Sequence, residues 1–396
     1  MTAGLALDED ALDWLAALLG ADDSGGVAQH GAERWAVLPS TRRPRVLVPL
    51  GSRRAATAVL SRDTGFSTTG RRLMGLAFRL GFPPPGLGGR LSVSAGHPFT
   101  GWIGNLLDEP GLRAGITIGP PRPNRKPVVQ LVRPDGTTAA WAKVSCTPLT
   151  RSLVINEGDW LEQLERMSSS STGATIETPR PLARTRWHDL DVLISAPLPE
   201  RDRAGGFVPD ATLLRSIADL EPGGVHVATQ SPWWSTLQGR ADAVTGLEGR
   251  AVLGPAFDSL GERLAEVAWP FGAWHGDLTS WNARPCGAVT QIWDWERAAG
   301  RQPVGFDAVH AAFQSAQIER RLDVAEAARV TDAVIAPVLR DLEVDPATGH
   351  DLVTSYLIER WLRWNEDTRR GSGTASGDRH AAMLVAIDTR SRVPAR

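Results

Sequence analysis

Residues 274–282 read Trp-His-Gly-Asp-Leu-Thr-Ser-Trp-Asn, and this stretch decides how the rest of the sequence is interpreted. Asp277 and Asn282 lie five positions apart within it. A short loop can point both side chains toward the same place. The carboxylate can then face a reacting hydroxyl group while the amide oxygen holds a metal ion.

A second polar segment follows at residues 291–296, which read Gln-Ile-Trp-Asp-Trp-Glu. Its apolar residues predict a strand that delivers Asp294, an oxygen ligand suited to Mg²⁺. Each segment alone can also be interpreted without a function, the first as a turn and the second as a helix cap. Both in this order, with the D-L-x-x-x-N spacing of phosphoryl-transfer loops, favour a site that transfers a phosphoryl group.

Together, the two segments resemble the signature of the aminoglycoside phosphotransferase and choline kinase-like superfamily. That signature is commonly HGDxxxxN followed by a strand that ends in IDWE. The resemblance covers roughly residues 110–396 and implies a two-lobed protein-kinase-like fold. It also implies that Asp277 is the catalytic base and that Asn282 and Asp294 are metal ligands.

The same resemblance implies supporting roles for three further residues. Gly305-Phe306-Asp307 resembles the next segment of the family, whose acid braces the backbone of the catalytic loop. Asp307 is therefore expected to be structural. His275 and Glu296 match the motif as well, and we expect them to support the site without reacting.

Lysine is rare in this chain, since all but two of the 43 basic residues are arginine. Lys143 lies inside an apolar strand, where a buried ammonium group is costly unless it is paired. Glu157 is the only charge on one apolar stripe of the helix that follows. The two predict the strand-lysine and helix-glutamate pair that positions nucleotide phosphates in kinases. The alternative is that Lys143 extends to solvent and Glu157 lies at the edge of the stripe.

The turn at residues 119–126 departs from the family pattern. It holds one glycine, and its prolines lack the N–H donors that would cradle a phosphate. Arg122, Arg125 and Lys126 can supply positive charge instead, so Arg125 and Lys126 are candidate nucleotide-binding residues. A solvated basic turn fits the sequence equally well.

The order of predicted elements indicates an α+β fold with three parts. Residues 1–100 form an N-terminal α/β extension of unknown role, 101–196 a β-rich N-lobe with one helix, and 197–396 a mostly helical C-lobe. The periodicity of apolar residues predicts helices at Asp8–Leu19, Ala55–Leu60, Thr69–Leu80 and Thr147–Arg166, and strands at Trp35–Leu38, Arg45–Leu50, Ile116–Ile118, Pro127–Arg133, Thr138–Val144 and Leu190–Ser195.

Composition excludes several other classes of protein. The net charge of −2 gives no field for nucleic acid or a membrane surface, and no apolar run is long enough to span a bilayer. Two cysteines cannot build a disulfide framework, and the acidic start does not suit a signal peptide. A cytoplasmic location is therefore expected. Spacings typical of metallohydrolases and serine hydrolases do not occur.

The sequence thus predicts an ATP-dependent, Mg²⁺-requiring enzyme that moves the γ-phosphate to a hydroxyl group of a small molecule. An aminoglycoside, a sugar and an amino alcohol all remain open as acceptors. Glu359, Glu366 and Asp367 would form an acidic wall for an aminoglycoside, although a solvated helix face explains them better. The alternative function is a nucleotide-binding regulatory module of the same fold without catalysis.

Overall fold

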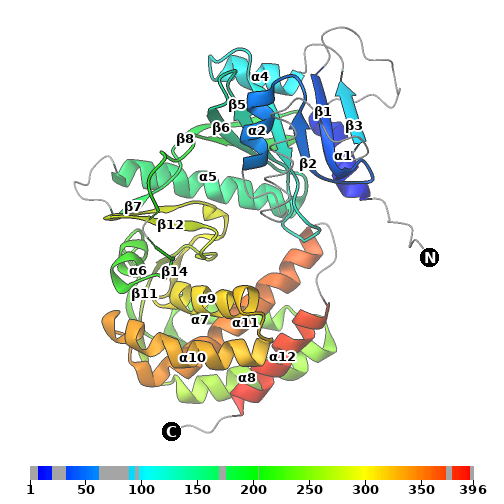
Figure 1. The fold of residues 1–396 in the computed structure, drawn as a ribbon. Helices are drawn as coiled ribbons and strands as arrows, with labels where there is room; N and C mark the ends of the chain where they lie inside the picture. Colours follow the sequence, from blue (N-terminus) through cyan, green and yellow to red (C-terminus); the bar gives the residue numbers. More distant parts are fainter. Residues whose placement is uncertain are drawn as a thin grey trace. The chain divides into compact units, whose positions relative to one another are not determined.

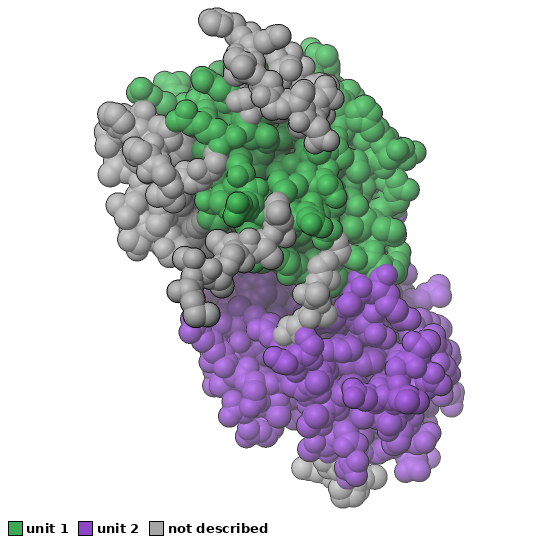
Figure 2. All heavy atoms as spheres, turned by 90° about the vertical axis from the view of Figure 1, so that its right-hand side faces the viewer, with its two compact units in different colours: residues 1–158, 180–197, 370–373 green, residues 159–179, 198–369, 374–396 purple. Residues whose placement is uncertain are grey.

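The computed structural model describes residues 8–19, 33–61, 89–93, 98–168, 175–203, 205–371 and 377–392. The chain divides into two compact units, which Figure 2 colours separately. Unit 1 comprises residues 1–158, 180–197 and 370–373, and unit 2 comprises residues 159–179, 198–369 and 374–396.

Unit 1 is built on one antiparallel sheet of eight strands in the order β3-β1-β2-β4-β5-β6-β9-β8 (Figure 1). The strands from the first hundred residues belong to the same sheet as the later ones, because β2 pairs with β4, with Leu47 opposite Ile116. The strands are β1 (Glu33–Ser40), β2 (Arg43–Pro49), β3 (Gly89–Val93), β4 (Arg113–Thr117), β5 (Val128–Val132), β6 (Thr138–Val144), β8 (Pro181–Trp187) and β9 (Leu190–Ser195).

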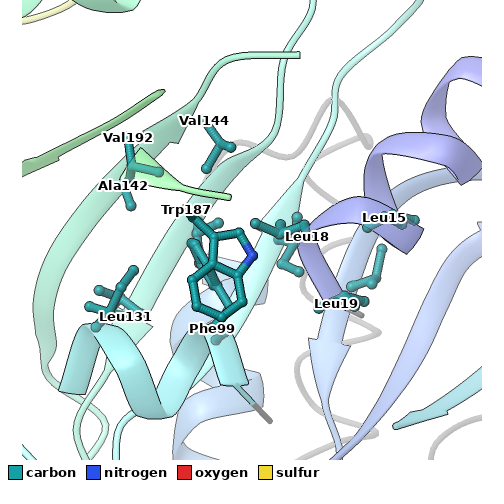
Figure 3. Close-up of a cluster of buried hydrophobic side chains, with 14 of the residues drawn as sticks. Leu15, Leu18, Leu19, Phe99, Leu131, Ala142, Val144, Trp187 and Val192 are labelled. Carbon is teal, nitrogen blue, oxygen red and sulfur yellow. The ribbon is translucent and has the colours of Figure 1, made fainter. Parts of the chain in front are cut away.

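The core of unit 1 has two parts because side chains alternate across the sheet. Trp35 and Val37 of β1 face a large cluster that contains Leu18, Phe99 and Trp187 (Figure 3). Their neighbours in β1 face a smaller cluster on the other side. The helices α1 (Glu9–Leu19) and α4 (Pro98–Leu106) pack on the large cluster. The helix α2 (Arg53–Ser61) packs on the small one.

Unit 2 is mostly helical and contains two three-stranded sheets, in the orders β10-β11-β14 and β12-β13-β7. Its strands are β7 (Ile176–Glu177), β10 (Gly224–Val227), β11 (Ala268–Trp274), β12 (Ala283–Cys286), β13 (Val289–Ile292) and β14 (Ala299–Pro303). Its helices are α6 (Ala211–Ala218), α7 (Pro232–Asp242), α8 (Leu247–Arg263), α9 (Phe306–Gln314), α10 (Val324–Asp341), α11 (Gly349–Arg370) and α12 (Gly377–Ser391), and α5 (Pro148–Ser168) continues into it from unit 1.

Short helical segments complete unit 2. A π-helical turn, η3 (Ser315–Glu319), follows α9, and a 3₁₀ turn, η2 (Trp295–Arg297), follows β13. The remaining 3₁₀ turns are η1 (Ala228–Gln230) and η4 (Pro346–Thr348). None of the described helices is long and apolar enough to cross a membrane.

The predicted α+β class, with a β-rich part before a mostly helical one, is confirmed. The helices predicted at residues 8–19, 55–60 and 147–166 are present with small shifts at their ends. Among the described residues of unit 1, three elements that the periodicity did not predict are also present, namely β3, β8 and α4. The helix predicted at residues 69–80 and most of the linker at 81–89 lie outside the described residues.

The division of residues 1–196 into an extension and an N-lobe stays a prediction about function. Structurally, the boundary drawn at residue 100 falls inside α4, and strands from both sides of it share one sheet and one core. A period-2 pattern predicts a strand but does not say with which other strand it pairs, so this continuity could not be predicted from the sequence.

Candidate active site

The loop after β11 turns sharply at Gly276, which has a φ of 76°. A Cβ atom at this position would lie 2.3 Å from the carbonyl oxygen of Arg297, so only glycine fits. The turn brings Asp277 to the end of a strand that is otherwise buried.

The backbone of this loop is held on both sides of Gly276. The Asp307 carboxylate accepts hydrogen bonds from the N–H groups of His275 and Gly276, at 2.6 and 3.0 Å. Arg363 donates to the Gly276 carbonyl oxygen at 2.9 Å, and its guanidinium group lies 4.6 Å from the centre of the Trp274 ring. Burial raises the pKa of Asp307, and the two N–H groups work against that rise.

Asp277 and Asn282 lie together at the mouth of the loop. The Asn282 amide nitrogen donates to the Asp277 carboxylate Oδ2 at 2.9 Å and to the Asp277 carbonyl oxygen at 3.0 Å. With its nitrogen engaged in this way, the Asn282 amide turns its oxygen away from Asp277. That oxygen is a hard ligand of the kind that Mg²⁺ prefers.

Asp294 lies just beyond β13, after Trp293, and has a left-handed backbone, with a φ of 71° and a ψ of 49°. Aspartate tolerates this region better than most residues, and such conformations cluster at functional sites. The Trp293 N–H donates to the Asn282 carbonyl oxygen at 3.0 Å, so the residues that precede Asp294 are tied to Asn282. The side chains of Asn282 and Asp294 therefore come from adjacent backbone segments. Their amide and carboxylate oxygens are ligands that fit Mg²⁺.

His275 joins these two segments. Its Nδ1 accepts from the Asp277 N–H at 3.2 Å, so its Nε2 carries the proton and donates to the Trp293 carbonyl oxygen at 3.1 Å. The imidazole packs edge-on against Trp295, with ring centres 4.7 Å apart. His275 is fully buried, and Glu296 is buried as well. These contacts suit the supporting roles expected of both residues.

His310 and Tyr356 complete the surroundings of Asp277, and the motifs gave no sign of either. His310 Nε2 lies 3.1 Å from Asp277 Oδ1, and Tyr356 donates its hydroxyl hydrogen to His310 Nδ1 at 2.9 Å. Burial alone would raise the pKa of Asp277, but the hydrogen bond from His310 and the positive charge of Arg360 hold that pKa below its usual value. The Asp277 carboxylate is thus kept ionised.

The far end of the loop is held by η3. The Ser280 hydroxyl donates to Glu319 at 2.6 Å, and Ser315 donates to the same carboxylate at 2.7 Å. Between the anchored residues, Trp281 leaves 42% of its surface exposed. A large aromatic ring thus projects from the loop that carries Asp277.

In unit 1, Lys143 of β6 and Glu157 of α5 form the ion pair that burial predicts. The ammonium nitrogen lies 2.6 Å from each carboxylate oxygen. The Lys143 side chain is 19% exposed and the Glu157 side chain only 4%. The pairing is present, and its role toward a nucleotide stays a prediction.

The basic turn of unit 1 differs from both interpretations of the sequence. Arg125 is buried, donates to both carboxylate oxygens of Asp8 at 2.7 and 2.8 Å, and lies 4.8 Å from the centre of the Trp14 ring. Lys126 is also buried, whereas Arg122 is exposed. Two of the three basic side chains of the turn are therefore not solvated. The Arg125 guanidinium ties α1 to the turn, which does not support its predicted contact with a nucleotide.

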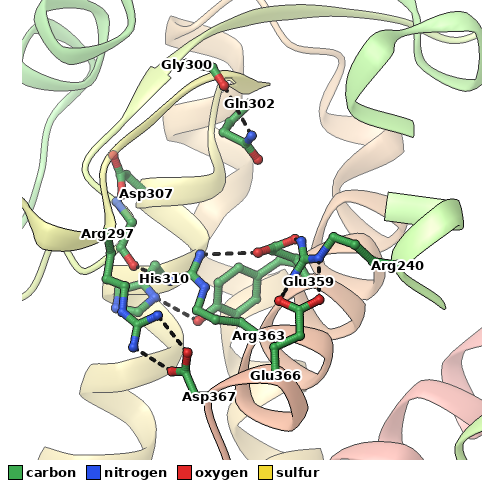
Figure 4. Close-up of polar contacts among 12 residues, drawn as sticks. Arg240, Arg297, Gly300, Gln302, Asp307, His310, Glu359, Arg363, Glu366 and Asp367 are labelled. Atoms are coloured by element: carbon green, nitrogen blue, oxygen red, sulfur yellow. Dashed lines mark hydrogen bonds and ion pairs between the residues drawn. The ribbon is translucent and has the colours of Figure 1, made fainter. Parts of the chain in front are cut away.

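The three acids of α11 are neither a solvated face nor an unpaired acidic wall (Figure 4). Glu359 is buried and pairs with Arg240, which also donates to Glu366 at 2.8 Å. Asp367 accepts from Arg297 at 3.0 Å. Spacing along a helix cannot reveal such partners, because Arg240 comes from α7, more than a hundred residues earlier.

Comparison with known proteins finds similarity in structure only. No protein-family model matches the chain, and no curated protein matches it in sequence.

Three similar solved structures illustrate the likeness. The aminoglycoside phosphotransferase APH(4)-Ia is 14% identical with a TM-score of 0.48, over 74% of this chain and 96% of that one. The amicoumacin kinase hAmiN, solved with AMP-PNP, Ca²⁺ and Ami, is 13% identical with a TM-score of 0.43, over 70% and 89%. A fructosamine-3-kinase-like protein from Haemophilus somnus 129PT is 12% identical with a TM-score of 0.40, over 74% and 98%.

These three solved structures are thus those of small-molecule kinases, the class of protein that the loop motif also resembles.

Proposed function

We propose that this protein is an ATP-dependent phosphotransferase that moves the γ-phosphate to a hydroxyl group of a small molecule. The observation that carries the proposal is the geometry of the catalytic loop. An ionised Asp277 carboxylate is fixed next to the Asn282 amide, and Asp294 follows on a backbone segment tied to Asn282. This is the set of groups that phosphoryl transfer needs.

Asp277 orients the acceptor hydroxyl and takes its proton. Each carboxylate oxygen accepts one hydrogen bond from the protein, so each keeps a lone pair for the substrate. The hydroxyl oxygen forms the new P–O bond, the bond to the leaving ADP breaks, and the hydroxyl proton moves to Asp277.

Asn282 and Asp294 would hold Mg²⁺ through their side-chain oxygens. When bound, the ion neutralises the charge on the nucleotide phosphates. The left-handed backbone at Asp294 orients its carboxylate in advance. The hydrogen bond that the Asn282 side-chain amide donates to Asp277 does the same for the Asn282 oxygen.

Lys143 would contact the nucleotide phosphates, with Glu157 holding its ammonium group. Glu157 is almost completely buried and holds the ammonium group of Lys143, whose side chain is partly exposed. Arg125 does not belong to the nucleotide-binding residues, because Asp8 accepts hydrogen bonds from both of its terminal nitrogens.

The charges of unit 2 favour an acceptor with few amines. A polycationic aminoglycoside needs unpaired carboxylates, and all three acids of α11 that were candidates are paired with arginine. The exposed ring of Trp281 on the catalytic loop offers an apolar face for a sugar or a similar ring. A sugar or an amino alcohol therefore suits this chain better than an aminoglycoside.

A nucleotide-binding module without catalysis is the second candidate. The observation that favours it is the turn at residues 119–126, where prolines replace N–H donors and Arg125 is engaged elsewhere. A protein that binds ATP without transferring its phosphate can function with fewer groups that position the phosphates.

Binding and turnover separate the two functions. Calorimetry with ATP and Mg²⁺ should show metal-dependent binding, and a panel of sugars, amino alcohols and aminoglycosides should stimulate ADP release, with the aminoglycosides weakest. Binding without stimulation or basal hydrolysis would favour the module. If no nucleotide binds with Mg²⁺ present, both candidates fail.

A further inference from the structure

The Asp277 carboxylate is clamped from two sides. His310 Nε2 approaches Oδ1 at 3.1 Å and the Asn282 amide approaches Oδ2 at 2.9 Å. A carboxylate on a single Cβ–Cγ bond otherwise rotates through a broad range. Two bonds to opposite oxygens hold its plane, and a proton-accepting group works best when its lone pair is aimed in advance.

The direction of the hydrogen bonds follows from the capacities of the groups. An ionised carboxylate only accepts, so a neutral His310 must carry its proton on Nε2. Its Nδ1 is then an acceptor, and the Tyr356 hydroxyl at 2.9 Å is the donor. The chain of bonds runs from Tyr356 through His310 to Asp277, with every donor and acceptor matched.

The side chains that form these hydrogen bonds are tightly packed. His310 is fully buried and Tyr356 is 1% exposed. The Tyr356 ring packs edge-on against Phe306 and Phe313, with centres 6.0 and 5.8 Å apart. His310 lies one turn after Asp307 on α9, so a single helix fixes both the backbone of the catalytic loop and the carboxylate that it carries.

We propose that Tyr356 and His310 are positioning residues, which hold Asp277 in the orientation that receives the proton of the acceptor hydroxyl. The proposal rests on the function proposed above. His310 transfers no proton in this scheme, since its Nε2–H donates to the Asp277 carboxyl group before and after that group is protonated.

The charges that face His310 agree with a neutral imidazole. Asp277 favours the protonated form, whereas Arg360 and Arg363 on α11 disfavour it, and Tyr356 is uncharged. Burial is the largest effect, and it lowers the pKa of His310 to about 4. The neutral form that the hydrogen bonds require is therefore the one present at neutral pH.

Two variants of the full chain test the proposal. Tyr356→Phe keeps the ring packing and removes the hydroxyl group, and it should lower kcat for MgATP turnover about fivefold, the equivalent of one hydrogen bond. His310→Leu should lower kcat about 100-fold through misplacement of the base. The dissociation constant for MgATP should not change in either variant. Thr331→Val removes another buried hydroxyl group in unit 2, whose bond stays within α10, and should leave kcat unchanged.

His310→Gln provides the rescue, because its amide nitrogen can still donate to Asp277, so its kcat should lie between those of wild type and His310→Leu. Water is the acceptor in this assay unless a better one emerges from the panel. Wild-type kcat in both Tyr356→Phe and His310→Leu would overturn the proposal.

Nitrogen-15 NMR of the wild-type protein gives a readout that needs no turnover. The His310 signal, assigned by its loss in His310→Gln, should show a neutral ring protonated at Nε2 between pH 6 and 8. A proton on Nδ1 would reverse the chain of bonds and overturn the proposal even if hydrolysis is too slow to measure. Absence of MgATP binding would instead refute the proposed function, and the NMR result would stand separately.

Discussion

The ion pair of unit 1 and the catalytic loop of unit 2 are held in different ways. Lys143 and Glu157 pair with each other from a strand and a helix that follow one another in the chain. The catalytic loop is held by Trp293, just after β13, and by groups from α9, η3 and α11. These groups lie 18 to 87 residues from their partners in the loop.

This difference indicates where substitutions should be tolerated. The pair joins a strand to the helix that follows it, so we expect a change at either residue to act on neighbouring elements. In the loop, the orientation of Asp277 depends on several bonds that share partners, and such networks respond non-additively to substitution. The loop should therefore be sensitive to distant changes that leave the pair untouched.

The largest effect should come from the centre of the loop. Asp277→Asn keeps the shape of the side chain and removes proton acceptance, so kcat should fall by about 1,000-fold. Nucleotide affinity should persist, as a calorimetric titration with MgATP can show. Turnover close to wild type would mean that Asp277 is not the base.

Asp294→Ala should affect binding more than structure. Loss of a carboxylate ligand should weaken Mg²⁺-dependent ATP affinity by about 100-fold. Removal of residues that merely orient a metal ligand costs up to about this much, so the loss of a ligand itself should cost at least as much. Titrating ATP with and without Mg²⁺ isolates the metal-dependent part. An unchanged metal dependence would remove Asp294 from the ligand set.

The buried imidazole in the loop network should make stability depend on pH. Burial holds the pKa of His310 at about 4 in the folded protein, below the ordinary 6.5 of the unfolded chain. Between these values the unfolded chain binds a proton that the folded one does not, so stability is lost as the pH falls through this window.

Urea unfolding checks this dependence. From pH 7 to pH 5, His310 should account for about 2 kcal/mol of lost unfolding free energy. His310→Gln should show a smaller loss over the same interval. Equal pH profiles for the two proteins would show that His310 does not titrate in this window.

The smallest effect is expected at the pair. Lys143→Arg should lower kcat/KM about tenfold, or roughly 1.4 kcal/mol, because a planar guanidinium group replaces a compact ammonium group against Glu157. Lys126→Arg makes the same chemical change at a buried position of the turn. It should alter the melting temperature and leave kcat/KM near wild type. Equal losses of kcat/KM at both positions would deny Lys143 a special role.

The sequence allowed the motif and the pair to be predicted for a physical reason. Lys143 and Glu157 are 14 residues apart, and each has a burial cost that demands a partner nearby. The supports of the loop leave no such local sign, since a histidine and a tyrosine on apolar helices look like ordinary core residues. The partner of Arg125 left no local sign either, because Asp8 is 117 residues away in the sequence.

The shared sheet of unit 1 has a practical consequence for recombinant fragments. A fragment of residues 101–396 would retain every motif residue yet lose β2, and with it the pairing of Leu47 with Ile116. Its β4 would become an open edge with unpaired N–H and C=O groups beside apolar side chains, which is a template for aggregation. Such a fragment should elute as soluble aggregates in size-exclusion chromatography where the full chain gives one defined peak. The first hundred residues would then have to be kept in any expression vector, even though none of the residues proposed for the active site lies in them.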